Sequence, residues 1–264
     1  MKNQAQWTLP LDEFATENTQ LQNYAEQLLV GKCMSSLGYD WVVPWQDPDF
    51  PAPPDVNAAG LRLFDVAIAG KWGYHFAPST NPEQTQAWSD YGEHVRSLAT
   101  EPNFDSSFDS CIEDARDGDD ILAEQDGNNF LSGLGMQATS VAESDPQVAD
   151  ALKEWHQCLS SAVDFTVGKT PWEGLLPDSV LQRFGLVGEQ LSETASAEEI
   201  AVATADAECR ESSQLSEKLY NIEWAEQQKL VDENRDKLEA IRAAGIARND
   251  KSREIVAENA PPAP

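Results

Sequence analysis

The C-terminal third of the chain carries the most regular spacing of apolar and small residues. In alternating steps of four and three they occupy Tyr220, Trp224, Gln227, Val231, Asn234, Leu238, Ile241 and Gly245. This spacing draws a narrow seam along one side of an α-helix, the geometry by which coiled-coil helices pack together. Ser196 followed by Glu199 is typical of a capping box, in which two side chains satisfy each other's free backbone amides. We predict one long helix over residues 196–258 and a disordered tail over 259–264.

A second helix with a similar seam is predicted near the N-terminus. After a polar lead-in over residues 1–10, apolar residues share one helical face at Phe14, Leu21, Tyr24 and Leu28. Gly38 is a natural helix stop. The pattern predicts a helix from Leu11 to Leu37, and we expect it to pack on the long C-terminal helix.

The intervening chain is predicted to be an irregular helical body over residues 11–195 with proline-rich loops. Prolines at 44, 48, 51, 53 and 54 forbid regular structure, and we expect Trp41 and Trp45 to anchor this segment. Helices are expected again at 108–122 and 146–165, with a polar, glycine-containing connection extending to Gly135. The fold class predicted is therefore mainly α.

Four widely spaced cysteines, none in a CxxC pair, indicate two disulfides formed in an oxidising compartment. Of the three pairings allowed, we choose Cys33–Cys111 and Cys158–Cys209, because each then closes one half of the chain. Cys33-Met34-Ser35-Ser36 is echoed by Cys158-Leu159-Ser160-Ser161. This echo suggests two related halves, at residues 11–140 and 141–210.

Charge and hydropathy limit the partners of the chain. Its 46 acidic and 18 basic residues give a formal net charge of -28, which repels nucleic acid and anionic membranes. No apolar run approaches the roughly 20 residues that span a bilayer. The polar start, Met1 to Gln4, has no signal-peptide pattern, so we expect an exported, mature chain whose leader has been removed.

No sequence motif points to catalysis. Phosphate-binding glycine loops, G-x-S-x-G and HExxH are absent, and the three histidines show no ligand spacing. Carboxylates that suit calcium gather at Asp117, Asp119, Asp120 and Asp126. An EF-hand loop counted from Asp117 fails, however, because Leu122 replaces the required glycine and Asn128 the required glutamate. No cofactor is predicted, and calcium remains an alternative.

Two sequence elements carry a resemblance to a known group of proteins. The first is Leu29-Val30-Gly31-Lys32-Cys33-Met34, which leads to Gly38-Tyr39, a proline segment and Trp72-Gly73-Tyr74. The second is Glu198-Glu199-Ile200-Ala201 with Asp206-Ala207-Glu208-Cys209, followed by the long helix. In these elements the chain resembles uncharacterised exported proteins of actinobacteria, often predicted lipoproteins. The resemblance implies a cell-envelope location and supplies no catalytic residues; a lipid-bearing cysteine would lie upstream of Met1.

These observations favour a non-enzymatic, extracytoplasmic envelope interaction or accessory protein that presents a helical surface to a protein partner. We predict that the C-terminal helix projects past Asn234 and contacts that partner through Leu238, Ile241, Arg242 and Ile246. One alternative is a secreted hydrolase of cell-wall glycan or peptide, since carboxylates and tryptophans are plentiful. The other is a calcium-binding surface protein.

Overall fold

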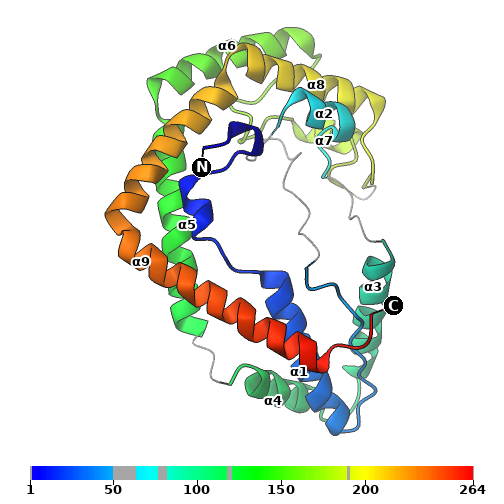
Figure 1. Cartoon of the computed structure of the whole chain (residues 1–264). Helices are drawn as coiled ribbons and strands as arrows, with labels where there is room; N and C mark the ends of the chain where they lie inside the picture. The colour runs from blue at the N-terminus through cyan, green and yellow to red at the C-terminus, as the bar shows by residue number, and fades with distance from the viewer. Residues whose placement is uncertain (1, 50–63, 77–81, 118–120, 189–190, 264) are drawn as a thin grey trace. The chain divides into compact units, whose positions relative to one another are not determined.

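The computed structural model describes residues 2–49, 64–76, 82–117, 121–188 and 191–263, and in these the fold is mainly α (Figure 1). Two short 3-10 helices, Gln4–Gln6 and Pro10–Glu13, precede the first α-helix. The α-helices among the described residues are α1 (Thr19–Ser36), α2 (Val66–Trp72), α3 (Pro82–Leu98), α4 (Phe104–Ala115), α5 (Ile121–Glu143), α6 (Pro146–Ala162), α7 (Asp178–Arg183), α8 (Ala197–Ser212) and α9 (Leu215–Asn259). The predicted fold class is confirmed. None of these helices combines the length and apolar character needed to cross a membrane.

The chain divides into two compact units, each assembled from three separate stretches. Unit 1 contains Met1–Asp12, Pro53–Pro78 and Ser132–Arg235, and unit 2 contains Glu13–Ala52, Ser79–Leu131 and Asp236–Pro264. The units therefore do not follow the chain order of the two halves suggested by the sequence echo. Each unit holds one disulfide: Cys158–Cys209 lies in unit 1 and Cys33–Cys111 in unit 2. This is the in-order pairing, and two disulfides are consistent with an oxidising compartment.

Unit 1 is organised around α8, which packs on both α2 and α6 (Figure 1). Ala203 and Ala207 are buried on α8, and such small side chains let neighbouring helices approach closely. Trp155 and Leu159 of α6 are fully buried against this face. Full burial of an aliphatic side chain such as Leu159 contributes about 1.5–3 kcal/mol. The disulfide from α6 to α8 ties together the two helices that supply most of this core.

The N-terminal residues form part of the unit 1 core. Trp7 and Leu9 are buried against Tyr220, whose hydroxyl donates to the carbonyl of Thr8. The backbone N–H of Leu11 donates to Oε1 of Gln227 at 3.1 Å. The interpretation of residues 1–10 as a mere polar lead-in is therefore wrong, because two of the apolar side chains among them are buried.

Unit 2 has its own core around α1, α4 and the end of α9. Cys33 of α1 is joined to Cys111 of α4, and Val256 of α9 is buried in the same cluster. Trp41, 4% exposed, stacks on Phe104 and Phe108 at centroid distances of 6.0 and 5.7 Å. Trp41 thus anchors the described part of the proline-rich segment, as the sequence predicts.

Helix α1 begins later than its apolar pattern predicts. The side chain of Asn18 accepts a hydrogen bond from the backbone N–H of Leu21, so α1 begins at Thr19 and not at Leu11. The predicted stop is confirmed: Gly38 has φ of 96°, and the N–H of Tyr39 donates to the carbonyl of Met34. This is a Schellman motif, in which glycine relieves the strain of a left-handed residue.

The predicted long C-terminal helix is two helices, α8 and α9. Ser213 and Gln214 separate them, and Gln214 has a left-handed φ of 57°. The Ser213 hydroxyl donates to the carbonyl of Cys209 at 2.8 Å, a local bond that competes with helix continuation. Helix α9 spans 45 residues and departs from helical geometry at Asn234. The seam itself is confirmed: Tyr220, Gln227, Val231 and Leu238 are all buried.

The end of α9 packs on α1 in unit 2, as the fold prediction expects (Figure 1). An ideal Cβ on Gly245 would lie 2.5 Å from Oγ1 of Thr16, so this glycine lets the segment before α1 approach the helix. After Asn259 the described residues 260–263 have no regular structure, and Ala260 packs against the unit 2 core.

Candidate functional site

A groove of about 530 Å³ lies within unit 1, beside the turn between α8 and α9. The N-terminal segment, the start of α2 and the α8–α9 junction form its walls. Its apolar lining residues, called the floor below, are Ala5, Trp7, Phe64, Val66, Ala67 and Ala207. Volumes of this size are typical of ligand-binding clefts in proteins.

Carboxylates line the groove together with the apolar floor. Asp65, Glu211 and Glu217 line the groove, and all three side chains are exposed to solvent. Arg210 is the cation among the described lining residues, and two hydrogen bonds of 2.9 and 2.7 Å commit its guanidinium to Asp206. Among the described lining residues, the exposed charged side chains are therefore all negative, which favours an incoming cation.

A buried network behind the floor fixes its shape. Asp206 is fully buried and accepts a hydrogen bond from Nε1 of Trp155 at 2.7 Å in addition to those from Arg210. The guanidinium of Arg210 lies 4.6 Å from the ring centroid of Phe64, which stacks in turn on Tyr74. A bidentate arginine–carboxylate pair holds both partners in one geometry. Phe64, part of the floor, is thereby held in place.

Tyr74 completes this network from the turn after α2. Its hydroxyl lies 3.4 Å from Oδ2 of Asp206. Burial raises the pKa of Tyr74 well above the ordinary value of tyrosine, and the negative charge of Asp206 raises it further. The phenol is therefore neutral over the physiological range and acts as a hydrogen-bond donor, not as a base.

A second buried carboxylate, Glu199, binds the turn after α2. Its Oε1 accepts from the backbone N–H of Tyr74 at 2.8 Å and lies 2.8 Å from Nδ1 of His75. The other ring nitrogen of His75 lies 3.0 Å from the carbonyl oxygen of Ser192. Both ring nitrogens are thus used within the fold, which suits a structural histidine better than a catalytic one.

The predicted capping box is only half formed. Oγ of Ser196 accepts from the backbone N–H of Glu199 at 3.1 Å, as expected. The Glu199 carboxylate does not accept a hydrogen bond from the backbone N–H of Ser196, because it is bonded to Tyr74 and His75 instead. Gly73 makes room for this arrangement: with φ of 60°, its ideal Cβ would lie 2.5 Å from Oε1 of Glu199.

Two of the four calcium candidates can be placed in the structure. Asp117 follows α4 and Asp126 lies within α5, whereas Asp119 and Asp120 lie outside the described residues. Within the described ranges, no group of three or more histidine, cysteine, aspartate or glutamate side chains is placed to hold a metal ion.

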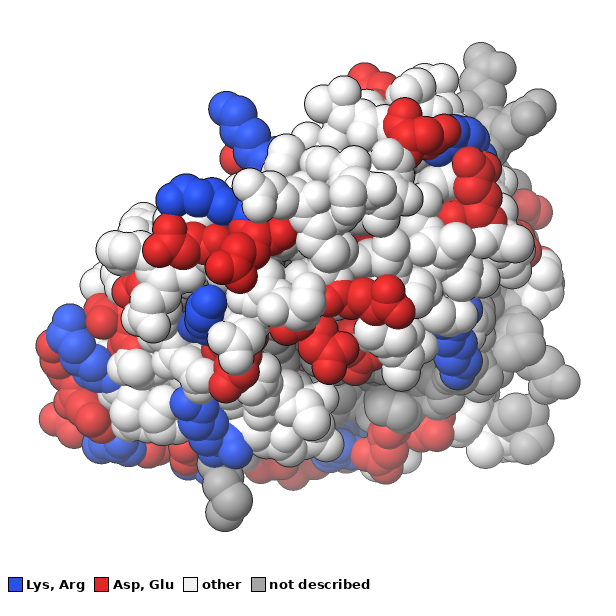
Figure 2. Space-filling view, turned by 90° about the horizontal axis from the view of Figure 1, so that it is seen from above, with Lys and Arg blue, Asp and Glu red and all other residues white. Residues whose placement is uncertain are grey.

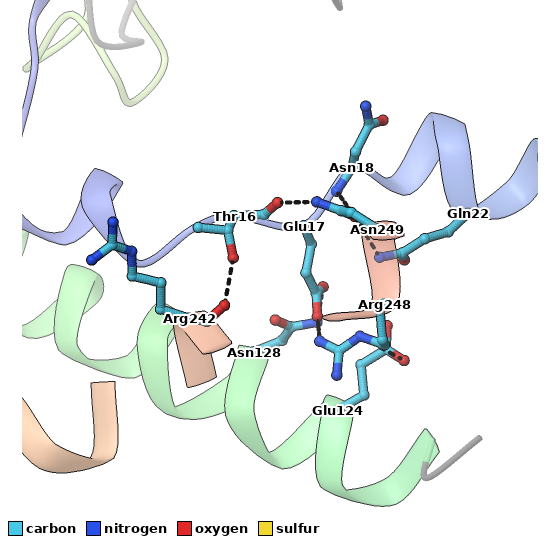
Figure 3. A network of polar contacts seen from close by, with 9 residues as sticks. All are labelled: Thr16, Glu17, Asn18, Gln22, Glu124, Asn128, Arg242, Arg248 and Asn249. Carbon is cyan, nitrogen blue, oxygen red and sulfur yellow. Dashed lines mark hydrogen bonds and ion pairs between the residues drawn. The ribbon is translucent and has the colours of Figure 1, made fainter. Parts of the chain in front are cut away.

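Of the four residues predicted to face a partner on α9, the structure buries one completely. Leu238 is fully buried, and Ile241 is half-buried against Gly127 of α5. The backbone carbonyl of Arg242 accepts from the Thr16 hydroxyl at 3.2 Å, as Figure 3 shows. Only Ile246 is exposed, at 44%. The segment past Asn234 is therefore packed in unit 2 and does not project.

Sequence reasoning missed the buried network, although a sequence pattern for it exists. Glu199, Ala203, Asp206 and Arg210 follow one another on α8 at spacings of four, three and four residues and are all buried. Charged residues that share the buried face of a helix with alanines indicate paired interior ions. The groove leaves no such pattern, because its walls come from three distant segments.

No protein-family model, no curated protein and no solved structure matches the chain.

Proposed function

We propose that this protein is a non-enzymatic, extracytoplasmic interaction protein of the cell envelope, and that the unit 1 groove binds a basic, apolar segment of a protein partner. The observation that carries the proposal is the apolar floor, which lines the groove together with Asp65, Glu211 and Glu217. Apolar side chains of the partner would cover the floor, while its lysines or arginines would meet the carboxylates. Complementary charge of this kind gives specificity and a fast association rate.

The net charge of the whole chain supports a basic partner. At -28 it attracts cations over a distance, and Figure 2 shows carboxylates in several separate groups on one face. Such a field raises association rates and weakens as salt screens it. Two disulfides support the extracytoplasmic location, since they persist where the environment is oxidising.

The commitment of the nearby polar groups supports binding over catalysis. Arg210, Asp206, Tyr74 and His75 are buried ionisable groups near the groove, and each is bound to another group of the fold. Oε2 of Glu199 has no hydrogen-bond partner among the described residues, but this side chain is fully buried and does not line the groove. A catalytic acid or base needs a free position directed at the substrate. This favours an accessory or interaction role for the groove.

Synthetic peptides test the proposal on the whole protein. A peptide of lysine and leucine should bind, while a glutamate–leucine peptide and a lysine–serine peptide should not, because each lacks one of the two complementary features. Fluorescence titration at two salt concentrations measures the affinities, and binding should weaken with salt. Equal binding of the lysine–serine peptide would show that the groove is not involved.

Matched variants locate the binding. Ala67→Trp fills the groove from an exposed position of α2 and should abolish peptide binding. The double variant E211Q/E217Q should weaken it, whereas E254Q/E258Q makes the same charge change at exposed positions of unit 2 and should not. If both double variants weaken binding equally, general charge and not the groove attracts the peptide.

A further inference from the structure

Unit 2 contains a pocket that is separate from the groove and different in chemistry. It has a volume of about 380 Å³ and is enclosed by side chains of α1, α4, α5 and α9. Amide side chains from α1 and α5 line it, together with charged groups of both signs. Arg116, Arg248 and Lys251 supply positive charge although the chain has only 18 basic residues in 264.

Two arginines of the pocket lining form ion pairs. Arg116 makes hydrogen bonds of 2.6 and 2.9 Å to Glu26, which raise the pKa of this arginine. Nε of Arg248 lies 3.6 Å from the carboxylate of Glu124, and its guanidinium also pairs with Glu17, as Figure 3 shows. Both positive and negative side chains, from different helices, thus line the pocket.

One buried donor beside the pocket makes no hydrogen bond to the residues that the structure describes. Nε of Arg248 is buried without a hydrogen-bond partner among the described residues. Burial also lowers the pKa of Arg248, although an arginine remains charged at any physiological pH. Ser252, which is 7% exposed, lines the pocket four residues further along α9. Positions 248, 251 and 252 therefore present two cations and a hydroxyl on one helix face.

We propose that this pocket binds a free amino acid in its zwitterionic form. The carboxylate of the ligand would bind Arg248, Lys251 and the hydroxyl of Ser252, and its ammonium group would bind Glu124. A zwitterion has no net charge, so the field of the acidic chain does not repel it as it would a simple anion. This site is independent of the groove proposed to bind a protein partner.

The first test uses the whole, isotopically labelled protein and an equimolar pool of the twenty standard amino acids. Each amino acid is present at about 10 mM, above the dissociation constant of a weak millimolar site. The pool should then shift the backbone amide signals of residues 124–128 and 248–252. Signals of groove residues should not move. A spectrum without shifts in these two segments would overturn the proposal, as would shifts confined to unit 1.

The second test identifies the groups recognised. For the strongest binder, the N-acetyl derivative lacks the ammonium group and the amide derivative lacks the carboxylate, so both should bind at least about tenfold more weakly. Ser252→Ala and Glu124→Gln should each weaken the amino acid about as much. Lys229→Gln removes an exposed lysine of α9 in unit 1 and should leave the affinity unchanged.

The two variants also separate binding from folding. Ser252→Ala removes one hydroxyl and leaves both ion pairs intact, so it keeps the test valid if loss of Glu124 disturbs Arg248. Two results together would show that the pocket is not the site. Ser252→Ala would bind the amino acid as tightly as the original chain does, and the original chain would bind the N-acetyl derivative as tightly as the amino acid.

Discussion

At the scale of single residues, the arrangement around Glu199 shows how one buried carboxylate organises its surroundings. It binds the turn after α2 through a backbone amide and a histidine, and Gly73 has no side chain where the carboxylate lies. Substitutions in this turn, and at Gly73 above all, should therefore lower the stability of the fold.

Gly73→Ala should therefore destabilise the protein. The substitution forces alanine into φ of 60° and places its Cβ against Oε1 of Glu199, at a cost of about 1–3 kcal/mol. The midpoint of urea unfolding measures the effect. Gly70→Ala is the matched control within α2: its Cβ would meet only Thr204, at 4.0 Å, and the midpoint should stay or rise.

Asp206→Ala should cost more. It leaves the buried guanidinium of Arg210 without its partner, and breaking a buried ion pair in this way costs about 3–5 kcal/mol. Asp150→Ala breaks the exposed pair with Lys153 and should leave the midpoint where it was. A small effect of Asp206→Ala, comparable with that of Asp150→Ala, would contradict the buried network.

At the scale of elements, the end of α9 shows a helix shaped by what packs on it. The Asn249 side chain accepts from the backbone N–H of Asn18 and donates to the carbonyl of Thr16, as Figure 3 shows. The chain before α1 is thereby held along the helix, and Gly245 is the point of closest approach.

Gly245→Ala should lower the unfolding midpoint, although alanine favours a helix by up to about 1 kcal/mol over glycine. The new Cβ would meet the hydroxyl of Thr16, which donates to Arg242, and that bond would break. Gly92→Ala in α3 of the same unit meets nothing within 4 Å and should raise the midpoint. Opposite signs for the two substitutions would confirm the packing role; two increases would refute it.

Elements were predictable where the pattern was local. The seam of α9 and the stop at Gly38 depend on near neighbours, and both appear in the structure. The start of α1 differs from the prediction because the apolar pattern continues past its cap, Asn18, whose side chain bonds locally to Leu21. The break at Gln214 differs because glutamine has no preference for a left-handed turn. The glycine-containing stretch expected to be irregular lies in helix α5, where Gly127 leaves room for Ile241.

At the scale of the whole molecule, both units contain buried tyrosines, which makes stability depend on pH in the alkaline range. Burial raises the pKa of Tyr91 from 10.0 to about 12 in unit 2, and it also raises the pKa of Tyr24 there and of Tyr74 in unit 1. The unfolded chain thus releases these protons at lower pH than the folded one.

The stabilisation from protonated Tyr91 is complete below pH 10.0 and is lost as the pH rises toward about 12. The unfolding midpoint should fall across this range, and it should fall less in Tyr91→Phe, which cannot ionise. At neutral pH the variant should lose only the hydrogen bond to Gln27. If the unfolding midpoint fell equally with rising pH in Tyr91→Phe and in the original chain, the raised pKa of Tyr91 would be contradicted.

The interleaving of the two units has a consequence for how the protein is made. Asn3 bonds to Tyr220 across 217 residues, and unit 1 has all its parts only once Arg235 is synthesised. Unit 2 draws its third stretch from residues 236–264 and is completed later still. Contacts between residues so distant in sequence slow folding. The growing chain therefore carries exposed apolar surface throughout its synthesis, and we expect it to depend on chaperones until α9 emerges.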